Sequence, residues 1–140
     1  MVSIVTASFD SLHLVQLHKW FVAEWKDVDP FKDSRNGHTI PPPLIAVEDE
    51  ALLGGLAFTR YKIPDVTRVG LWVCALYVDV AHRNKGIGSR LIREAEKSAL
   101  SINENELFAL TNIPAFYENF GWEVVCKDDK GMVVKRDVQD

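Results

Sequence analysis

An unbroken apolar stretch, Leu71 to Val78, reads LWVCALYV and is followed directly by polar residues. It is rich in β-branched and aromatic residues, which favour a strand. Because apolar and polar residues do not alternate, the pattern indicates a strand that is covered on both faces. A buried helical segment is the alternative, and the short length and the polar turn that follows favour the strand.

Similar patterns predict the other elements along the chain. Short β-branched or apolar segments predict strands at residues 2–7, 44–48, 52–60, 107–110, 122–127 and 132–135. Apolar residues three and four positions apart predict helices over residues 11–25, after Gly88, and from Ile113 to a terminating Gly121. Residues 49–51 would close a hairpin, and residues 61–70 would form a polar connection to the apolar strand. The order predicts a mixed α/β fold around a single, largely antiparallel sheet.

Two features stand outside this regular pattern. The adjacent glycines Gly54 and Gly55 lie within a predicted strand, which indicates a β-bulge or a close backbone approach. Residues 26–43 contain four prolines and no clear periodicity, and long irregular segments of this kind are often functional loops. Trp20 and Trp25, just before this segment, would either line a pocket or pack in the core.

Composition narrows the class of protein. The chain has 140 residues, of which 47% are hydrophobic and 26% charged, as expected for one globular domain over residues 1–140. A net charge of −4 argues against nucleic acid as the principal partner. The sequence has neither a basic, apolar leader nor an apolar run long enough to cross a membrane. We therefore expect a cytoplasmic protein with no membrane partner.

The segment after the apolar strand has the chemistry of an anion site. It reads Arg83-Asn84-Lys85-Gly86-Ile87-Gly88-Ser89 and leads into an amphipathic helix. Glycines let the backbone approach a ligand, and the first turn of a helix offers unpaired N–H groups at the positive end of its dipole. The cationic side chains of Arg83 and Lys85 and the hydroxyl of Ser89 add further hydrogen-bond donors. The spacing fits neither the dinucleotide-binding fingerprint nor the Walker loop.

Residues 78–91 resemble the acetyl-CoA-binding motif of the GNAT superfamily of N-acetyltransferases. The family pattern, Gln/Arg-x-x-Gly-x-Gly/Ala, is matched at Arg83, Gly86 and Gly88. Asn84 stands where glycine is common, and asparagine tolerates left-handed backbone better than most residues; Val80 stands where proline is common. Residues 116–122, FYENFGW, resemble a second family segment, Phe/Leu-Tyr-x-x-x-Gly-Phe/Trp.

The resemblance implies a GNAT-type fold, in which two central parallel strands splay apart within a largely antiparallel sheet flanked by helices. It implies acetyl-CoA as the co-substrate and no metal. The pyrophosphate would bind to the loop and the pantetheine arm to the strand and to an asparagine. The residues implied in coenzyme binding are Leu76, Tyr77, Val78, Arg83, Asn84, Lys85, Gly86, Ile87, Gly88, Ser89 and Asn112.

The resemblance also assigns catalytic roles. A backbone N–H near Val78 would polarise the thioester carbonyl, and Tyr117 would protonate the leaving thiolate as a general acid. Packing of Tyr117 against the pantetheine, without acid chemistry, is the alternative. The general base stays open between water, three carboxylates chosen by rough position (Glu24, Glu48 and Asp65), and His82, considered because an imidazole can accept a proton near neutral pH.

The function implied is transfer of an acetyl group from acetyl-CoA to a primary amine of a small molecule or peptide, by direct attack. The alternative is a non-catalytic, acyl-CoA-binding regulatory or interaction module, since the loop suits both. We expect an amine acceptor as the partner, no nucleic acid, and a monomer or homodimer.

Overall fold

The apolar stretch at residues 71–78 lies in the centre of a seven-stranded sheet, whose strand order is β1-β2-β3-β4-β5-β7-β6. The structure is a computed structural model that describes residues 1–8, 11–24, 40–64, 68–129 and 131–138. In chain order its elements are β1 (Ser3–Thr6), α1 (Leu12–Glu24), β2 (Leu44–Glu48), β3 (Ala51–Lys62), β4 (Val69–Val78), the 3₁₀ turn η1 (Val80–His82), α3 (Ile87–Ser101), β5 (Glu106–Thr111), α4 (Pro114–Glu118), β6 (Glu123–Asp128) and β7 (Gly131–Asp137).

The predicted strands and helices of the described residues are present, with ends shifted by a few positions. The largest difference is at residues 61–70, where a polar connection was expected. Here β3 and β4 continue as a paired hairpin, with Tyr61 opposite Gly70 and Lys62 opposite Val69. Backbone pairing with a neighbouring strand extends both strands even where their side chains are exposed, so the polar character of this segment was misleading.

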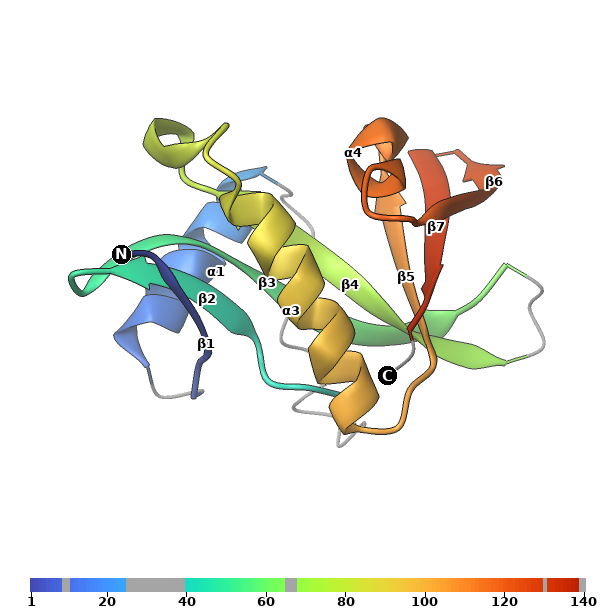
Figure 1. The fold of residues 1–140 in the computed structure, drawn as a ribbon, viewed down its shortest axis with the longest axis horizontal. Helices are drawn as coiled ribbons and strands as arrows, with labels where there is room; N and C mark the ends of the chain where they lie inside the picture. Colours follow the sequence, from blue (N-terminus) through green and yellow to red (C-terminus); the bar gives the residue numbers. More distant parts are fainter. Residues whose placement is uncertain (9–10, 25–39, 65–67, 130, 139–140) are drawn as a thin grey trace.

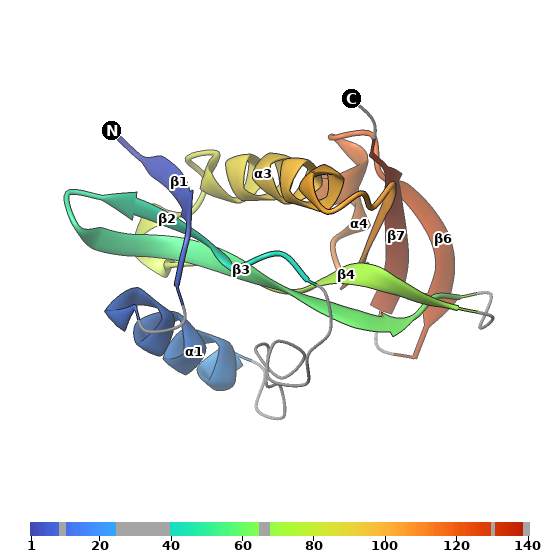
Figure 2. The same cartoon turned by 90° about the horizontal axis from the view of Figure 1, so that it is seen from below.

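Two helices cover opposite faces of the first half of the sheet (Figure 2). The apolar stripe of α3 packs on one face, and its buried residues are Ile87, Leu91, Ile92, Ala95 and Ala99. On the other face, α1 buries Leu14, Leu17 and Phe21 against β2, β3 and β4. Burial on both sides explains why β4 reads as an unbroken apolar run.

The sheet is split between its two central strands. β4 and β5 run parallel but pair only at Trp72 with Phe108 and at Val73 with Ala109. Beyond these pairs the two strands diverge toward their C-terminal ends (Figure 1). Residues 75–78 of β4 therefore remain paired with β3, while residues 74–78 have no strand partner on the β5 side within the described part of the chain. This arrangement confirms the predicted GNAT-type fold.

The predicted close approach at the glycine pair is also present. A Cβ on Gly54 would lie 2.6 Å from the Tyr77 carbonyl oxygen, and one on Gly55 would lie 2.7 Å from Leu17 Cδ2. Larger side chains would therefore push β3 away from β4 and from α1. In the hairpin of β2 and β3, the pairing register shifts between Ala46 and Val47, and Ala46 lies opposite Gly54.

Neither α1 nor α3, nor any other helix in the described part of the chain, is long and apolar enough to cross a bilayer.

Candidate active site

The loop between β4 and α3 presents a row of unpaired backbone donors. Gly86 has a left-handed backbone (φ +82°) and precedes the first residue of α3, and Asn84 is also left-handed (φ +64°). The first helical hydrogen bond runs from Arg90 N to Gly86 O, at 3.1 Å. Within the described residues, the N–H groups of residues 84–89 donate no backbone hydrogen bond. These groups and the helix dipole form an arrangement suited to a phosphate.

Arg83 braces this loop against the end of β4. Its Nε donates a hydrogen bond of 2.8 Å to the Val78 carbonyl oxygen, and its guanidinium lies 5.1 Å from the centre of the Tyr77 ring. Tyr77 in turn lies 5.4 Å from the Trp20 ring at the end of α1. Arg83 therefore shapes the loop as well as adding positive charge, while the exposed Lys85 has no such contact among the described residues.

The segment that contains Tyr117 meets the loop at the same end of the split. The position that a Cβ on Gly88 would take lies 3.4 Å from Phe116 Cζ and 3.9 Å from Val78 Cγ2. The end of β4, the first turn of α3 and α4 therefore come together here. Tyr117 follows Phe116, and the centres of their rings are 5.1 Å apart.

Tyr117 itself is almost enclosed. Its side chain is 5% exposed, and its ring packs 5.0 Å from that of Trp122. Burial raises the pKa of the phenol to about 12, because the charged phenolate would lose its hydration. No side-chain oxygen or nitrogen of the described residues is both fully buried and without a hydrogen-bond partner. The phenol is thus held in its protonated form, as an acid requires.

Asn112 is not brought into contact with the loop. It is exposed, and its Oδ1 lies 2.8 Å from the position of a Cβ on Gly131, at the turn between β6 and β7. The neighbouring Thr111 hydroxyl accepts a hydrogen bond from Ile113 N at 2.9 Å, which fixes the start of α4. A contact between Asn112 and pantetheine stays a prediction.

The candidate bases are scattered. Glu48 forms an ion pair of 3.1 Å with the Met1 amino group, and Glu24 is exposed at the last position of α1. His82 Nε2 lies 3.9 Å from Asp79 Oδ2 beside the loop. Asp65 lies outside the described residues, as do Trp25 and residues 26–39, where a functional loop was predicted.

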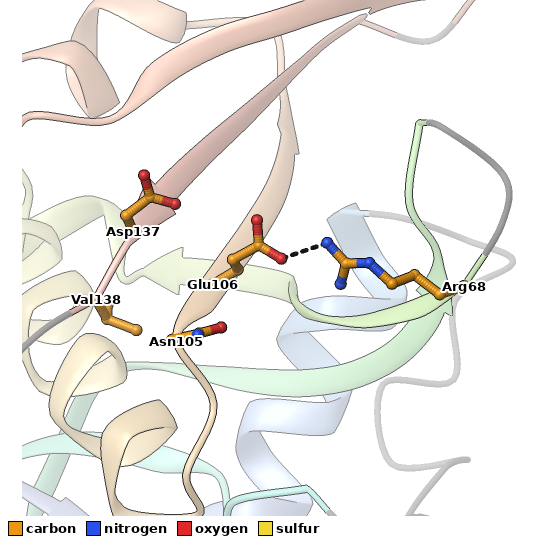
Figure 3. A pocket seen from close by; sticks show the side chains of 5 residues that line it. All are labelled: Arg68, Asn105, Glu106, Asp137 and Val138. Atoms are coloured by element: carbon orange, nitrogen blue, oxygen red, sulfur yellow. Dashed lines mark hydrogen bonds and ion pairs between the residues drawn. The ribbon is translucent and has the colours of Figure 1, made fainter.

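An open cavity of about 460 Å³ lies at the other end of the central strands (Figure 3). Its lining residues are Arg68, Asn105, Glu106, Asp137 and Val138. Hydrogen bonds from Arg68 and Lys135 hold the pKa of the Glu106 carboxyl below its usual value. The charges are thus paired with one another, and the cavity lies beside the first residue of β5, away from the loop that follows β4. In the described parts of the chain, no three His, Cys, Asp or Glu side chains gather as metal ligands would.

Sequence reasoning did not find a polar bridge that joins α3 to the second half of the sheet. Glu96, on the polar face of the predicted helix, accepts hydrogen bonds from Trp122 and Arg136. These three residues are far apart in the chain, so no spacing indicates that they meet. The polar Nε1 of a tryptophan that packs in the core was the one available signal, since such a group usually has a partner.

The family follows from the sequence as a whole. Residues 42–124, more than half of the chain, match the family model described as an acetyltransferase (GNAT) domain. The chain therefore belongs to the GNAT acetyltransferase family, which confirms the resemblance at residues 78–91 and 116–122. No curated protein matches the chain.

Solved structures of acetyltransferases share the fold. A GNAT family acetyltransferase from Brucella melitensis, in complex with acetyl-CoA, is similar over 100% of this chain and 90% of its own (18% identity, TM-score 0.74). The PaiA N-acetyltransferase of Thermoplasma acidophilum, in complex with coenzyme A, is similar over 98% of this chain and 99% of its own (19% identity, TM-score 0.69). Arabidopsis thaliana Naa50, in complex with the bisubstrate analogue CoA-Ac-MVNAL, is similar over 96% of this chain and 97% of its own (18% identity, TM-score 0.69). At these identities the similarity establishes the fold.

Proposed function

We propose that this chain is an N-acetyltransferase that transfers an acetyl group from acetyl-CoA to a primary amine. One observation carries the proposal. The unpaired N–H groups of residues 84–89 lie at the start of α3, directly after the part of β4 that has separated from β5. A pyrophosphate needs several converging donors, and an extended pantetheine arm needs an unpaired strand edge.

Different parts of the chain would hold different parts of the coenzyme. The loop donors and the charge of Lys85 suit the pyrophosphate. The free edge of residues 74–78 suits the amide groups of the pantetheine arm, which can pair with it as a further strand would. This edge includes Leu76, Tyr77 and Val78, which the resemblance implies in coenzyme binding.

Acetyl-CoA supplies an activated thioester. The neutral amine forms a bond to the carbonyl carbon, the carbon–sulfur bond breaks, and the thiolate receives a proton. A backbone N–H near Val78 stabilises the negative charge that develops on the carbonyl oxygen. Tyr117 donates the proton to sulfur, and its raised pKa keeps that proton available at neutral pH. Water carries the proton of the amine to solvent.

The acceptor is a small-molecule or peptide amine. Support for a peptide comes from the shared fold with Arabidopsis Naa50, which was solved with an analogue that joins coenzyme A to the segment Ac-MVNAL. Cytoplasmic location, the absence of a metal and of nucleic-acid or membrane partners, and a monomeric or homodimeric state remain predictions.

The test is release of coenzyme A thiol from acetyl-CoA across a panel of amines, including polyamines, amino acids and peptides with free N-termini. We expect release with at least one amine and none from a Gly88→Glu variant, whose added charge would repel the phosphates. Saturable binding of acetyl-CoA without release for any amine would instead support the non-catalytic binding module.

A further inference from the structure

The Glu96 carboxylate joins three segments of the chain, and Glu96, Trp122 and Arg136 are called the Glu96 bridge below. Its Oε2 accepts a hydrogen bond from Trp122 Nε1, and its Oε1 accepts one from Arg136 Nε, both at 3.3 Å. Arg136 Nη1 also donates to the Gly121 carbonyl oxygen, at 3.1 Å. The carboxylate is 17% exposed, so solvent screens these bonds only partly.

The Glu96 bridge leads directly to Tyr117. The Trp122 backbone N–H donates a hydrogen bond of 3.3 Å to the Tyr117 carbonyl oxygen, and the centres of the two rings are 5.0 Å apart. Two further contacts lie closer to the start of α3. Phe120 lies 5.7 Å from the Arg93 guanidinium, and Phe116 packs beside Gly88. The segment 116–122 therefore follows α3 from the loop to Glu96.

The split sheet explains why such a tie matters. β4 and β5 pair at only two positions, so few backbone hydrogen bonds join the two halves of the sheet, and side-chain contacts across α3 carry the rest of their attachment. The loop and α3 belong with β1–β4, whereas α4, β6 and β7 lie on the far side of the split (Figure 1). The Glu96 carboxylate adds charge-assisted hydrogen bonds from two donors on the far side, so it attaches α3 to both of them.

We propose that Glu96 is a positioning residue, which ties α3 to Trp122 and Arg136 and so holds Tyr117 in place relative to the phosphate loop. This inference rests on the proposed function, because only the proposed role of Tyr117 as the proton donor to the leaving thiolate requires Tyr117 to be held in place. Glu96 does not touch the coenzyme; it acts through Trp122. Acid catalysis is sensitive to such placement, since small displacements of a catalytic group slow a reaction severely.

Three variants test the proposal. Glu96→Ala removes both acceptors, while Glu96→Gln keeps one carbonyl oxygen, which can accept one of the two bonds. Glu94→Ala is the matched control, because Glu94 lies on the same helix and pairs only with Lys97, at 3.2 Å, within the described residues. We expect kcat to fall about 10- to 100-fold in Glu96→Ala, with an intermediate loss in Glu96→Gln. The control should keep the wild-type kcat.

The affinity for acetyl-CoA separates positioning from general damage. The loop donors are backbone groups on the near side of the split, so the Kd measured by calorimetry should stay close to wild type in all three variants. An unchanged kcat in Glu96→Ala would overturn the proposal. So would a Kd that weakens in step with the loss of kcat, or an equal loss in Glu94→Ala.

A spectroscopic titration of Tyr117 tests whether Glu96 holds it in place, and it does not require an active enzyme. Enclosure raises the pKa of Tyr117 to about 12, and loosening of the Glu96 bridge should lower it toward the ordinary value. Phenolate absorbance is titrated in wild type and Glu96→Ala, with Tyr117→Phe assigning the signal and circular dichroism confirming that each sample is folded. If no amine supports thiol release by the wild type, the proposed function fails. In that case a lowered pKa in Glu96→Ala still supports the positioning of Tyr117, and an unchanged pKa overturns it.

Discussion

Tyr117 directly follows Phe116, which packs beside the loop at Gly88, and its own side chain is nearly completely buried. Tyr117→Phe keeps the ring and removes only the hydroxyl, so packing against Trp122 should survive. We expect acetyl-CoA affinity close to wild type and a turnover lower by roughly 10²–10⁴, the usual contribution of one positioned acid. Steady-state kinetics with an accepted amine measures this. Unchanged turnover would show that Tyr117 serves packing alone.

Burial of Tyr117 should also make the free energy of unfolding depend on pH in the alkaline range. The folded-state pKa of Tyr117, about 12, lies above the ordinary value of 10.0, so the unfolded chain loses this proton first. Its stabilising contribution is complete below pH 10 and is lost as the pH rises toward 12. The slope contributed is at most about 1.4 kcal/mol per pH unit for one proton. Denaturant unfolding across this range should show a shallower decline in Tyr117→Phe, and equal slopes would contradict the enclosure of the phenol.

Arg83 tests whether shape or charge governs the loop. Arg83→Lys keeps the positive charge but loses the Nε bond to the Val78 carbonyl and the planar contact with Tyr77. We expect the Kd for acetyl-CoA to weaken about tenfold, which corresponds to one hydrogen bond to a charged group. Arg83→Ala should weaken it at least as much. A lysine variant with wild-type affinity would show that charge alone is required.

At the scale of elements, β4, the loop and α3 form the unit that the sequence predicted best. Composition and periodicity identified the strand, the glycine loop and the helix because each is determined by local chemistry. The hairpin turn predicted at residues 49–51 is present at Asp49 and Glu50, but its backbone conformation was not predicted. Both residues are left-handed, with φ of +50° and +69°, although neither is a glycine or an asparagine. Pairing of β2 with β3 imposes the left-handed backbone of both residues, and the side chains themselves give little sign of that conformation.

Gly88, in the first turn of α3, separates steric from electrostatic effects. An added Cβ would be in ordinary contact with Phe116 and Val78, so Gly88→Ala should fold and bind acetyl-CoA nearly as wild type does. Gly88→Glu adds a negative charge where the pyrophosphate is proposed to lie, and we expect it to abolish binding. Calorimetry on both variants, with melting temperatures as the folding control, makes the comparison. Equal affinities in the two variants would remove the phosphate site from this turn.

At the scale of the whole molecule, the two ends of the central strands have different tasks. The loop end presents unpaired donors, whereas the other end pairs its charges. There Arg68, from the hairpin of β3 and β4, meets Glu106 at 2.6 Å (Figure 3). Lys135 of β7 also meets Glu106, at 3.0 Å. The second half of the sheet is thus tied to the first by two polar contacts, from Glu106 to Arg68 and from Arg136 of β7 to Glu96.

Glu106 should therefore affect acid stability and leave binding unchanged. Its hydrogen bonds to Arg68 and Lys135 lower the pKa of its carboxyl below the ordinary value of 4.5. Its contribution is present above pH 4.5 and is lost as the pH falls through the lower, folded-state pKa. Glu106→Gln should lower the free energy of unfolding at neutral pH and show a weaker decline in acid, with wild-type affinity for acetyl-CoA. Equal acid sensitivity would contradict the pairing.

The long-range contacts at this scale could not be predicted from the sequence. Glu96, Trp122 and Arg136 each have an ordinary local role as a helix-surface acid, an aromatic residue and a charged residue near the end of the chain. Their meeting depends on the fold of the split sheet. Position along the sequence likewise could not show that Glu48 pairs with the Met1 amino group or that Asn112 faces Gly131.

The most direct test is to follow the backbone amides by NMR while acetyl-CoA is added. Saturable shifts should centre on residues 84–89 and on the free edge of β4 at residues 74–78, and the amides that line the cavity near Arg68 and Glu106 should stay unchanged. Addition of inorganic pyrophosphate should shift the amides of residues 84–89 but not those of the β4 edge. No saturable change, or changes confined to the cavity, would contradict a coenzyme site at the split of the sheet.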